Sequence, residues 1–105
     1  MNVVYKTEGS RYIEWENTEK SIIFGDDDLS INLKNRQKDV DVVVDVCATR
    51  DGDLVIGAAT GYRYIAQVEI PAKEYIEVEQ DEETVQEEVP WDIDKCTLYL
   101  YAMEV

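Results

Sequence analysis

Residues 40–60 read VDVVVDVCATRDGDLVIGAAT, and this stretch decides the fold class. Valine stands at positions 40, 42, 44 and 46, alternating with Asp41, Val43, Asp45 and Cys47. A period of two is typical of a half-buried β-strand. The Asp51-Gly52 dipeptide that follows is the strongest short signal for a hairpin turn. The stretch therefore predicts two strands, 40–48 and 54–60, paired antiparallel.

The same period recurs on both sides of this hairpin. Residues 12–16, 29–34 and 62–70 alternate apolar and polar side chains, and residues 96–103 are apolar on both faces. A strand that is apolar on both faces belongs in the middle of a sheet. For a chain of 105 residues, the pattern predicts one all-β domain spanning 1–105. We expect a small antiparallel β-sandwich or barrel of eight to nine short strands.

Pro71 interrupts the alternating pattern. Proline marks a bend or an edge, so we expect the strand before it to bend and run on, with Ile76 and Val78 turned inward. Residues 81–89 are the best candidate for a helix, because Val85 and Val89 are four residues apart and Pro90 follows. The prediction is at most one short helix, near 81–89.

Charge excludes some partners. The chain has 24 acidic and 10 basic residues and a net charge of −14, which opposes direct binding to nucleic-acid phosphates and to anionic membranes. With 45% hydrophobic residues it is no disordered acidic tail. There is no N-terminal signal pattern and no apolar run of about 18 residues, so we expect a soluble protein of the cytoplasm.

The residue types also limit catalysis. Without histidine, no Ser-His or Cys-His pair can form within the chain. Cys47 and Cys96 cannot supply the four ligands of a structural zinc site, and we expect two buried free thiols in preference to a disulfide. With 24 carboxylates, carboxylate pairs are inevitable and uninformative. We therefore expect no enzyme and no cofactor.

One segment weakly imitates a calcium loop. Oxygen-bearing residues stand at 26, 28, 30 and 32, which makes Asp26 and Asp28 weak metal candidates. The sixth position lacks glycine, and Gln37 occupies the twelfth position, where glutamate is needed. A polar turn followed by a strand is the favoured interpretation.

The charge is unevenly distributed. Residues 73–95 carry a net charge of −8, whereas residues 34–38 carry +3. We expect the acidic segment, with Trp91 beside it, to form an interaction surface, and the basic loop to be its counterpart on another copy. Head-to-tail contacts of this kind close into rings or run into filaments. Trp91 either plugs one end of the fold or anchors the interface. The candidate interaction residues are Trp91, Asp81, Glu82, Glu83, Glu87, Glu88, Lys34, Arg36 and Lys38.

These observations favour a non-enzymatic structural or protein-interaction module that acts through its surface, as a subunit of a larger assembly such as a prophage-type particle. Its partner would be a basic protein or a second copy. The alternative is an acidic inhibitor that imitates nucleic acid and occupies the basic groove of a partner protein. A small hydrolase is the third and least favoured reading.

Overall fold

The computed structural model describes residues 1–103 and confirms an all-β single domain. Ten strands and two short 3-10 turns lie within these residues, and none of these elements is an α-helix. The strands are β1 (Asn2–Tyr5), β2 (Trp15–Asn17), β3 (Ser21–Phe24), β4 (Leu29–Asn32), β5 (Val42–Ala48), β6 (Leu54–Ile56), β7 (Arg63–Ile70), β8 (Tyr75–Gln80), β9 (Glu83–Glu88) and β10 (Thr97–Leu100); the turns are η1 (Lys34–Arg36) and η2 (Ile93–Lys95).

The larger sheet has five strands in the order β1-β10-β7-β5-β6. The C-terminal strand β10 therefore lies inside the sheet, as its apolar faces predict. Its pairing with β1 is parallel, which corrects the expectation of a purely antiparallel fold. The N-terminus is held at this strand because the backbone N–H of Asn2 donates to the carbonyl of Cys96 over 2.9 Å. The Met1 ammonium group also lies 3.1 Å from Oδ1 of Asp94.

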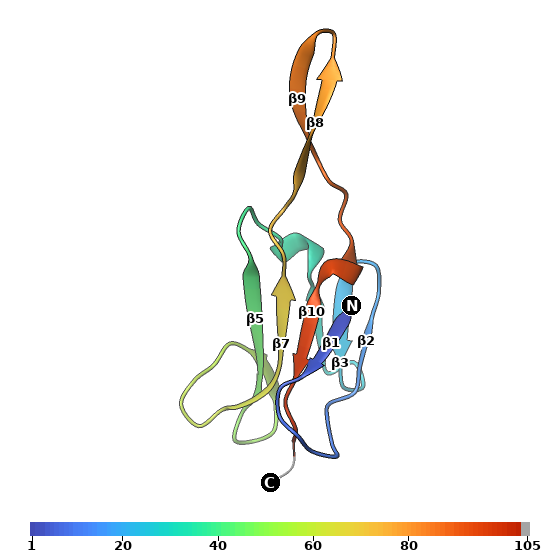
Figure 1. Ribbon diagram of the computed structural model, residues 1–105. Helices are drawn as coiled ribbons and strands as arrows, with labels where there is room; N and C mark the ends of the chain where they lie inside the picture. Colours follow the sequence, from blue (N-terminus) through green and yellow to red (C-terminus); the bar gives the residue numbers. More distant parts are fainter. Residues whose placement is uncertain (104–105) are drawn as a thin grey trace.

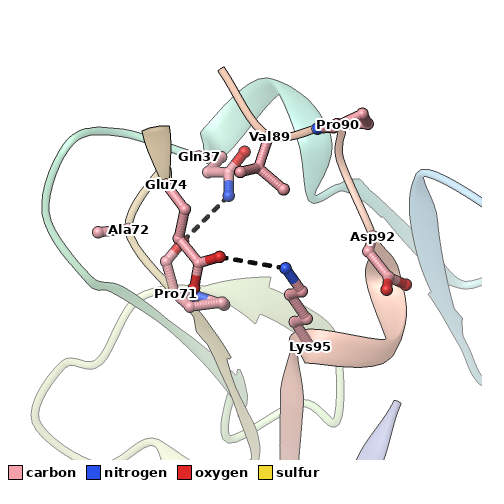
Figure 2. A pocket seen from close by; sticks show the side chains of 8 residues that line it. All are labelled: Gln37, Pro71, Ala72, Glu74, Val89, Pro90, Asp92 and Lys95. Carbon is pink, nitrogen blue, oxygen red and sulfur yellow. Dashed lines mark hydrogen bonds and ion pairs between the residues drawn. The ribbon is translucent and has the colours of Figure 1, made fainter. Parts of the chain in front are cut away.

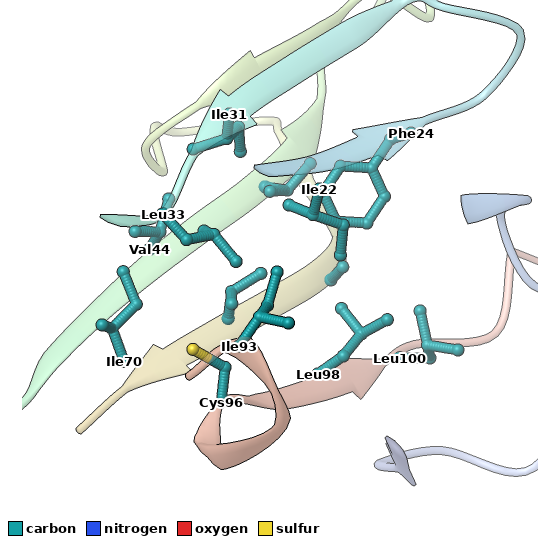
Figure 3. Packing of buried hydrophobic residues seen from close by; sticks show 13 residues of the cluster. Ile22, Phe24, Ile31, Leu33, Val44, Ile70, Ile93, Cys96, Leu98 and Leu100 are labelled. Atoms are coloured by element: carbon teal, nitrogen blue, oxygen red, sulfur yellow. The ribbon is translucent and has the colours of Figure 1, made fainter. Parts of the chain in front are cut away.

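A three-stranded sheet, β2-β3-β4, shares one apolar core with the larger sheet. Figure 3 shows Ile22 and Phe24 of β3 on one side of this core and Leu98 and Leu100 of β10 on the other. The sheet order is open at both ends, so the strands of residues 1–103 form no closed barrel. The buried cluster comprises Ile22, Phe24, Ile31, Leu33, Val44, Val46, Ala66, Val68, Ile70, Ile93, Cys96, Leu98 and Leu100.

The hairpin predicted from residues 40–60 is present. Strand β5 pairs antiparallel with β6, which ends at Ile56, earlier than expected. Gly52 in the connecting turn has φ of 87°, a left-handed conformation that glycine adopts without strain. Cys47 and Cys96 are both buried free thiols, which confirms the prediction for them.

Strands β8 and β9 form a third sheet of their own, which projects from the body formed by the other two sheets (Figure 1). We call residues 75–88 the arm. The arm makes the molecule 62 Å long and only 25 × 23 Å across. The radius of gyration is 16.8 Å, whereas a compact domain of this length has about 13 Å.

The arm corrects two predictions. Residues 83–88 form a strand where a helix was expected, and the chain after Pro71 leaves the body rather than continuing its sheet. Val85 pairs with Val78 across the hairpin, so its apolar contact comes from the neighbouring strand and not from Val89. Ile76, predicted to face inward, is 53% exposed.

Candidate functional site

The arm has two distinct faces. In its antiparallel register Ile76 pairs with Glu87, Val78 with Val85, and Gln80 with Glu83. Since directly paired residues point to the same side of a sheet, Ile76, Val78 and Val85 share one face, which we call the apolar face. Every arm side chain is exposed except Val78, which is half-buried.

Charge distinguishes the arm from the rest of the chain. It holds seven carboxylates and no lysine or arginine, so it carries half of the net charge of −14. Glu83 and Glu87 lie on the apolar face, and Glu77, Glu79 and Glu88 lie on the opposite face. The apolar face is therefore a small hydrophobic patch with an acidic rim.

The tip is a two-residue turn, Asp81-Glu82, whose φ angles are 50° and 70°. Two residues with positive φ are the signature of the type I′ turn, which favours Asn-Gly. Residues with a Cβ pay a steric cost in this region. The turn therefore holds two carboxylates at the extreme end of the arm at some cost in local stability.

The base of the arm is fastened to the body by several polar contacts. Figure 2 shows two of them: Nζ of Lys95 lies 3.2 Å from Oε2 of Glu74, and the Gln37 amide donates to the carbonyl of Pro71 over 3.1 Å. The backbone N–H of Lys73 donates to the carbonyl of Lys38 over 2.8 Å. These contacts give the arm a defined starting point on the body.

Trp91 lies beside this base and packs against the core. Its indole Nε1–H donates a 2.6 Å hydrogen bond to the carbonyl of Glu19, in the turn between β2 and β3. These contacts favour the interpretation of Trp91 as a plug at the end of the body. Its partly exposed side lines two open clefts of about 350 and 500 Å³.

Cations and carboxylates both border the clefts: Glu88 lines the first, and Glu19, Asp92 and Asp94 line the second. Lys34 lines both, Lys73 lines the first, and Lys20 lines the second. Lys73 pairs with Glu88 over 3.4 Å, whereas neither Lys34 nor Lys20 makes an ion pair within residues 1–103. Six of the ten basic residues gather around the base of the arm, and we call them the basic end: Lys20, Lys34, Arg36, Lys38, Lys73 and Lys95.

The structure brings some predicted residues together and separates others. Lys34 and Arg36 form η1, Lys38 follows it, and Lys34 shares a cleft with Trp91. The predicted acidic residues divide: Asp81 and Glu82 form the tip, whereas Glu83, Glu87 and Glu88 lie along β9. Tip and basic end therefore lie at opposite ends of the same arm.

The list of candidate interaction residues did not include three exposed apolar residues of the arm. They are Tyr75, Ile76 and Val85, which are 48%, 53% and 41% exposed. The sequence does contain a pattern that indicates a hairpin in this segment. Ile76 and Val78 alternate with glutamates, and Thr84-Val85 are residues that favour strands. Read as a hairpin about Asp81-Glu82, this pattern places Val78 opposite Val85.

The remaining candidates are the two weak metal candidates and the cysteines. Asp26 and Asp28 are exposed in the turn between β3 and β4, and residues 1–103 contain no group of three or more potential metal ligands. Every buried side chain in this part of the chain is apolar or a cysteine. Burial raises the pKa of the Cys96 thiol to about 11, which keeps it protonated and unreactive at neutral pH.

No helix among the described residues is long and apolar enough to cross a membrane. Comparisons with protein-family models, curated proteins and solved structures find no match to this chain.

Proposed function

We propose that this protein is a non-enzymatic protein-interaction module and that the arm is its binding element. The observation that carries the proposal is an ordered hairpin that lends no buried side chain to the core of its own body. A two-stranded hairpin alone in water is marginally stable at best. A surface held this far from the body is suited to contact with another molecule.

The side chains of the arm indicate what kind of surface its partner would present. The exposed Ile76 and Val85 supply apolar contact area, and the acidic rim favours a positively charged protein surface. That surface belongs to a basic protein or to the basic end of another copy. A module with one projecting arm on a compact body also suits a subunit of a larger assembly. Such a role needs no catalytic group.

The test replaces the apolar face. We expect the double variant Ile76→Ser/Val85→Ser to fold normally and to lose the partners that the native protein captures from its own cells. The matched control is Val40→Ser/Val43→Ser, which changes two exposed valines of the body, 65% and 56% exposed, and should retain those partners. Equal capture by both variants would contradict the proposal.

The nucleic-acid mimic remains a second candidate, because seven carboxylates on a narrow arm form an extended negative surface. These carboxylates point to both faces of the hairpin, whereas a basic groove would read one continuous row of phosphates. If the mimic is the function, duplex DNA at physiological salt should displace the captured partner. If the module is the function, DNA should leave the complex intact.

A further inference from the structure

The two outer edges of the arm differ. The backbone N–H of Val89 donates to the carbonyl of Glu74 over 2.8 Å, which sets the alternation of the hairpin ladder. From this alternation the backbone groups of Tyr75, Glu77 and Glu79 face outward on β8. Those of Thr84, Gln86 and Glu88 face outward on β9.

The edge of β8 is protected against further strand pairing. Two of its outward-facing residues are glutamates, and charged residues are a common device for protecting an edge strand. Just before β8 the N–H of Lys73 is occupied by the Lys38 carbonyl, and the hydroxyl of Tyr75 donates to Asp39 over 2.6 Å. The segment from 38 to 39 therefore covers the base of this edge.

The edge of β9 is open. Of its three outward-facing residues, Thr84 and Gln86 are uncharged and only Glu88, at the base, carries a charge; threonine also favours strands. Below β9 the edge leads to the cleft lined by Lys34, Pro90 and Trp91. One side of the arm therefore offers a free ladder of backbone groups that ends at an unpaired cation.

We propose that a second copy of this chain docks on the β9 edge, antiparallel and with two-fold symmetry, so that the two arms form one four-stranded sheet. The inference rests on the proposed function of the arm as a binding element, and it names the partner for this edge. Four strands are a far more stable unit than two. Two-fold dimers are also the commonest oligomers of soluble proteins.

Among the registers that pair most of β9, the charges favour one. With the symmetry axis at Gln86, the opposite pairs are Gln86 with Gln86, Thr84 with Glu88, and Val85 with Glu87, so no two carboxylates of β9 stand directly opposite. Moving the axis to residue 85 would place Glu83 opposite Glu87, and moving it to residue 87 would place two copies of Glu87 together. Like charges directly opposite are destabilising, and the remaining carboxylates are diagonal neighbours about 7–8 Å apart, which repel less.

The same register joins the tip to the basic end. With Gln86 on the axis, Glu83 at the start of β9 in one copy stands opposite Val89 of the other, so the tip turn Asp81-Glu82 comes level with Pro90. The turn then lies at the level of the cleft where Lys34 has no ion pair within residues 1–103, so the Glu82 carboxylate is the group proposed to pair with it. This contact occurs twice in the dimer. It makes use of the separation of the acidic tip from the basic end along the arm.

Proline substitutions on the two strands distinguish pairing at the β9 edge from pairing at the β8 edge. The outward N–H of Gln86 has no role in its own hairpin, so Gln86→Pro should leave the arm folded and remove the central hydrogen bond from each copy. Glu77, the cross-strand neighbour of Gln86, supplies the matched control Glu77→Pro on the β8 edge. We expect Gln86→Pro to raise the dimer dissociation constant roughly tenfold or more, and Glu77→Pro to leave it nearly unchanged.

A charge swap tests the register without proline. Lys34→Glu and Glu82→Lys should each weaken the dimer, and the double variant, which keeps the net charge of −14, should restore it. Glu16→Lys on the exposed part of β2 controls for a change of net charge alone.

The readout is sedimentation equilibrium in 0.15 M salt up to about 0.5 mM protein, with circular dichroism to confirm folding. The expected result is a species of twice the 12.1 kDa chain mass, whose dissociation constant changes in each variant as stated above. A monomer throughout, an open series of larger species, or a dimer indifferent to Gln86→Pro and to the charge swap would overturn the two-fold arm pairing. Those outcomes would not bear on the proposed role of the arm in binding other proteins, which the capture experiment with Ile76→Ser/Val85→Ser tests separately.

Discussion

The hydroxyl of Tyr75 donates a 2.6 Å hydrogen bond to Oδ1 of Asp39, and this contact joins the first residue of the arm to the segment that leads into β5. The pKa of Tyr75 is raised, first because the hydrogen bond to Asp39 favours the neutral phenol, then by burial and by the charges of Asp39 and Glu88. Exposed side chains therefore supply part of the attachment of the arm, beside the backbone hydrogen bond from Lys73 to Lys38.

Removing this hydrogen bond should loosen the arm. In Tyr75→Phe we expect the backbone amides of 75–88 to exchange several-fold faster, while the free energy of unfolding of the body falls by less than about 1 kcal/mol. Hydrogen exchange measured by NMR distinguishes the two regions. Tyr62→Phe is the control, because Tyr62 is exposed and its hydroxyl has no hydrogen bond within residues 1–103. Unchanged exchange in the arm would show that its other contacts suffice.

Alkaline pH should destabilise the fold through Cys96. Burial raises the pKa of this thiol from 9.0 to about 11, so its contribution is present below pH 9 and is lost as pH rises toward 11. We expect the stability advantage of the native protein over Cys96→Ala to be constant below pH 9 and to shrink above it. Urea unfolding across pH 7–11 measures the difference. The raised pKa values of Tyr75, Tyr99 and Tyr101 act on both proteins alike, so they cancel in the comparison.

The tip should gain stability from glycine. Glu82 has φ of 70°, so Glu82→Gly should relieve local strain and protect the arm amides by about 0.5–1 kcal/mol. Glu82→Gln removes the charge but keeps the strain, and should give no such gain.

At Gly25, where φ is 67°, a Cβ would lie 2.5 Å from Oδ2 of Asp28, so Gly25→Ala should destabilise the turn between β3 and β4.

The body should fold without the arm. Replacing 75–88 by Asn-Gly closes the chain directly above the Glu74–Val89 hydrogen bond and removes no buried residue. We expect a melting temperature within a few degrees of the native value and a radius of gyration reduced from 16.8 Å toward about 13 Å in X-ray scattering. A chain that no longer folds would show that the arm stabilises the body.

Removing ten residues from the other end should have the opposite effect. Deletion of residues 96–105 takes away β10, with the buried side chains of Cys96, Leu98 and Leu100, and separates β1 from β7. We expect loss of the cooperative unfolding transition and of the near-ultraviolet circular dichroism. A folded product would mean that the larger sheet tolerates an empty central position.

Much of the body was predictable from local pattern. The alternation of valines in 40–46 and the Asp51-Gly52 turn predicted the pairing of β5 with β6, because both signals act between neighbours in the chain. The two apolar faces of 96–103 likewise placed β10 inside a sheet. The parallel partner of β10 was not predictable, because β1 lies at the far end of the sequence and its pattern does not specify a neighbour.

The candidate site was only partly predictable. The sequence located the acidic segment and Trp91, but it could not decide between helix and strand for residues 81–89. Val85 can satisfy either a helical contact with Val89 or a cross-strand contact with Val78, and the energies of these two local choices are similar. The hairpin register, which involves residues on both sides of the tip, decides between them.

By itself the sequence therefore determined the strand-rich composition, the central position of β10, the free buried thiols and the concentration of negative charge. Only the tertiary structure decided that residues 75–88 leave the body as an arm and that six cations gather at its base. The reason is that alternation and charge are properties of adjacent residues. The separation of arm from body depends instead on which apolar side chains pack into the shared core, and Ile76 and Val85 are not among them.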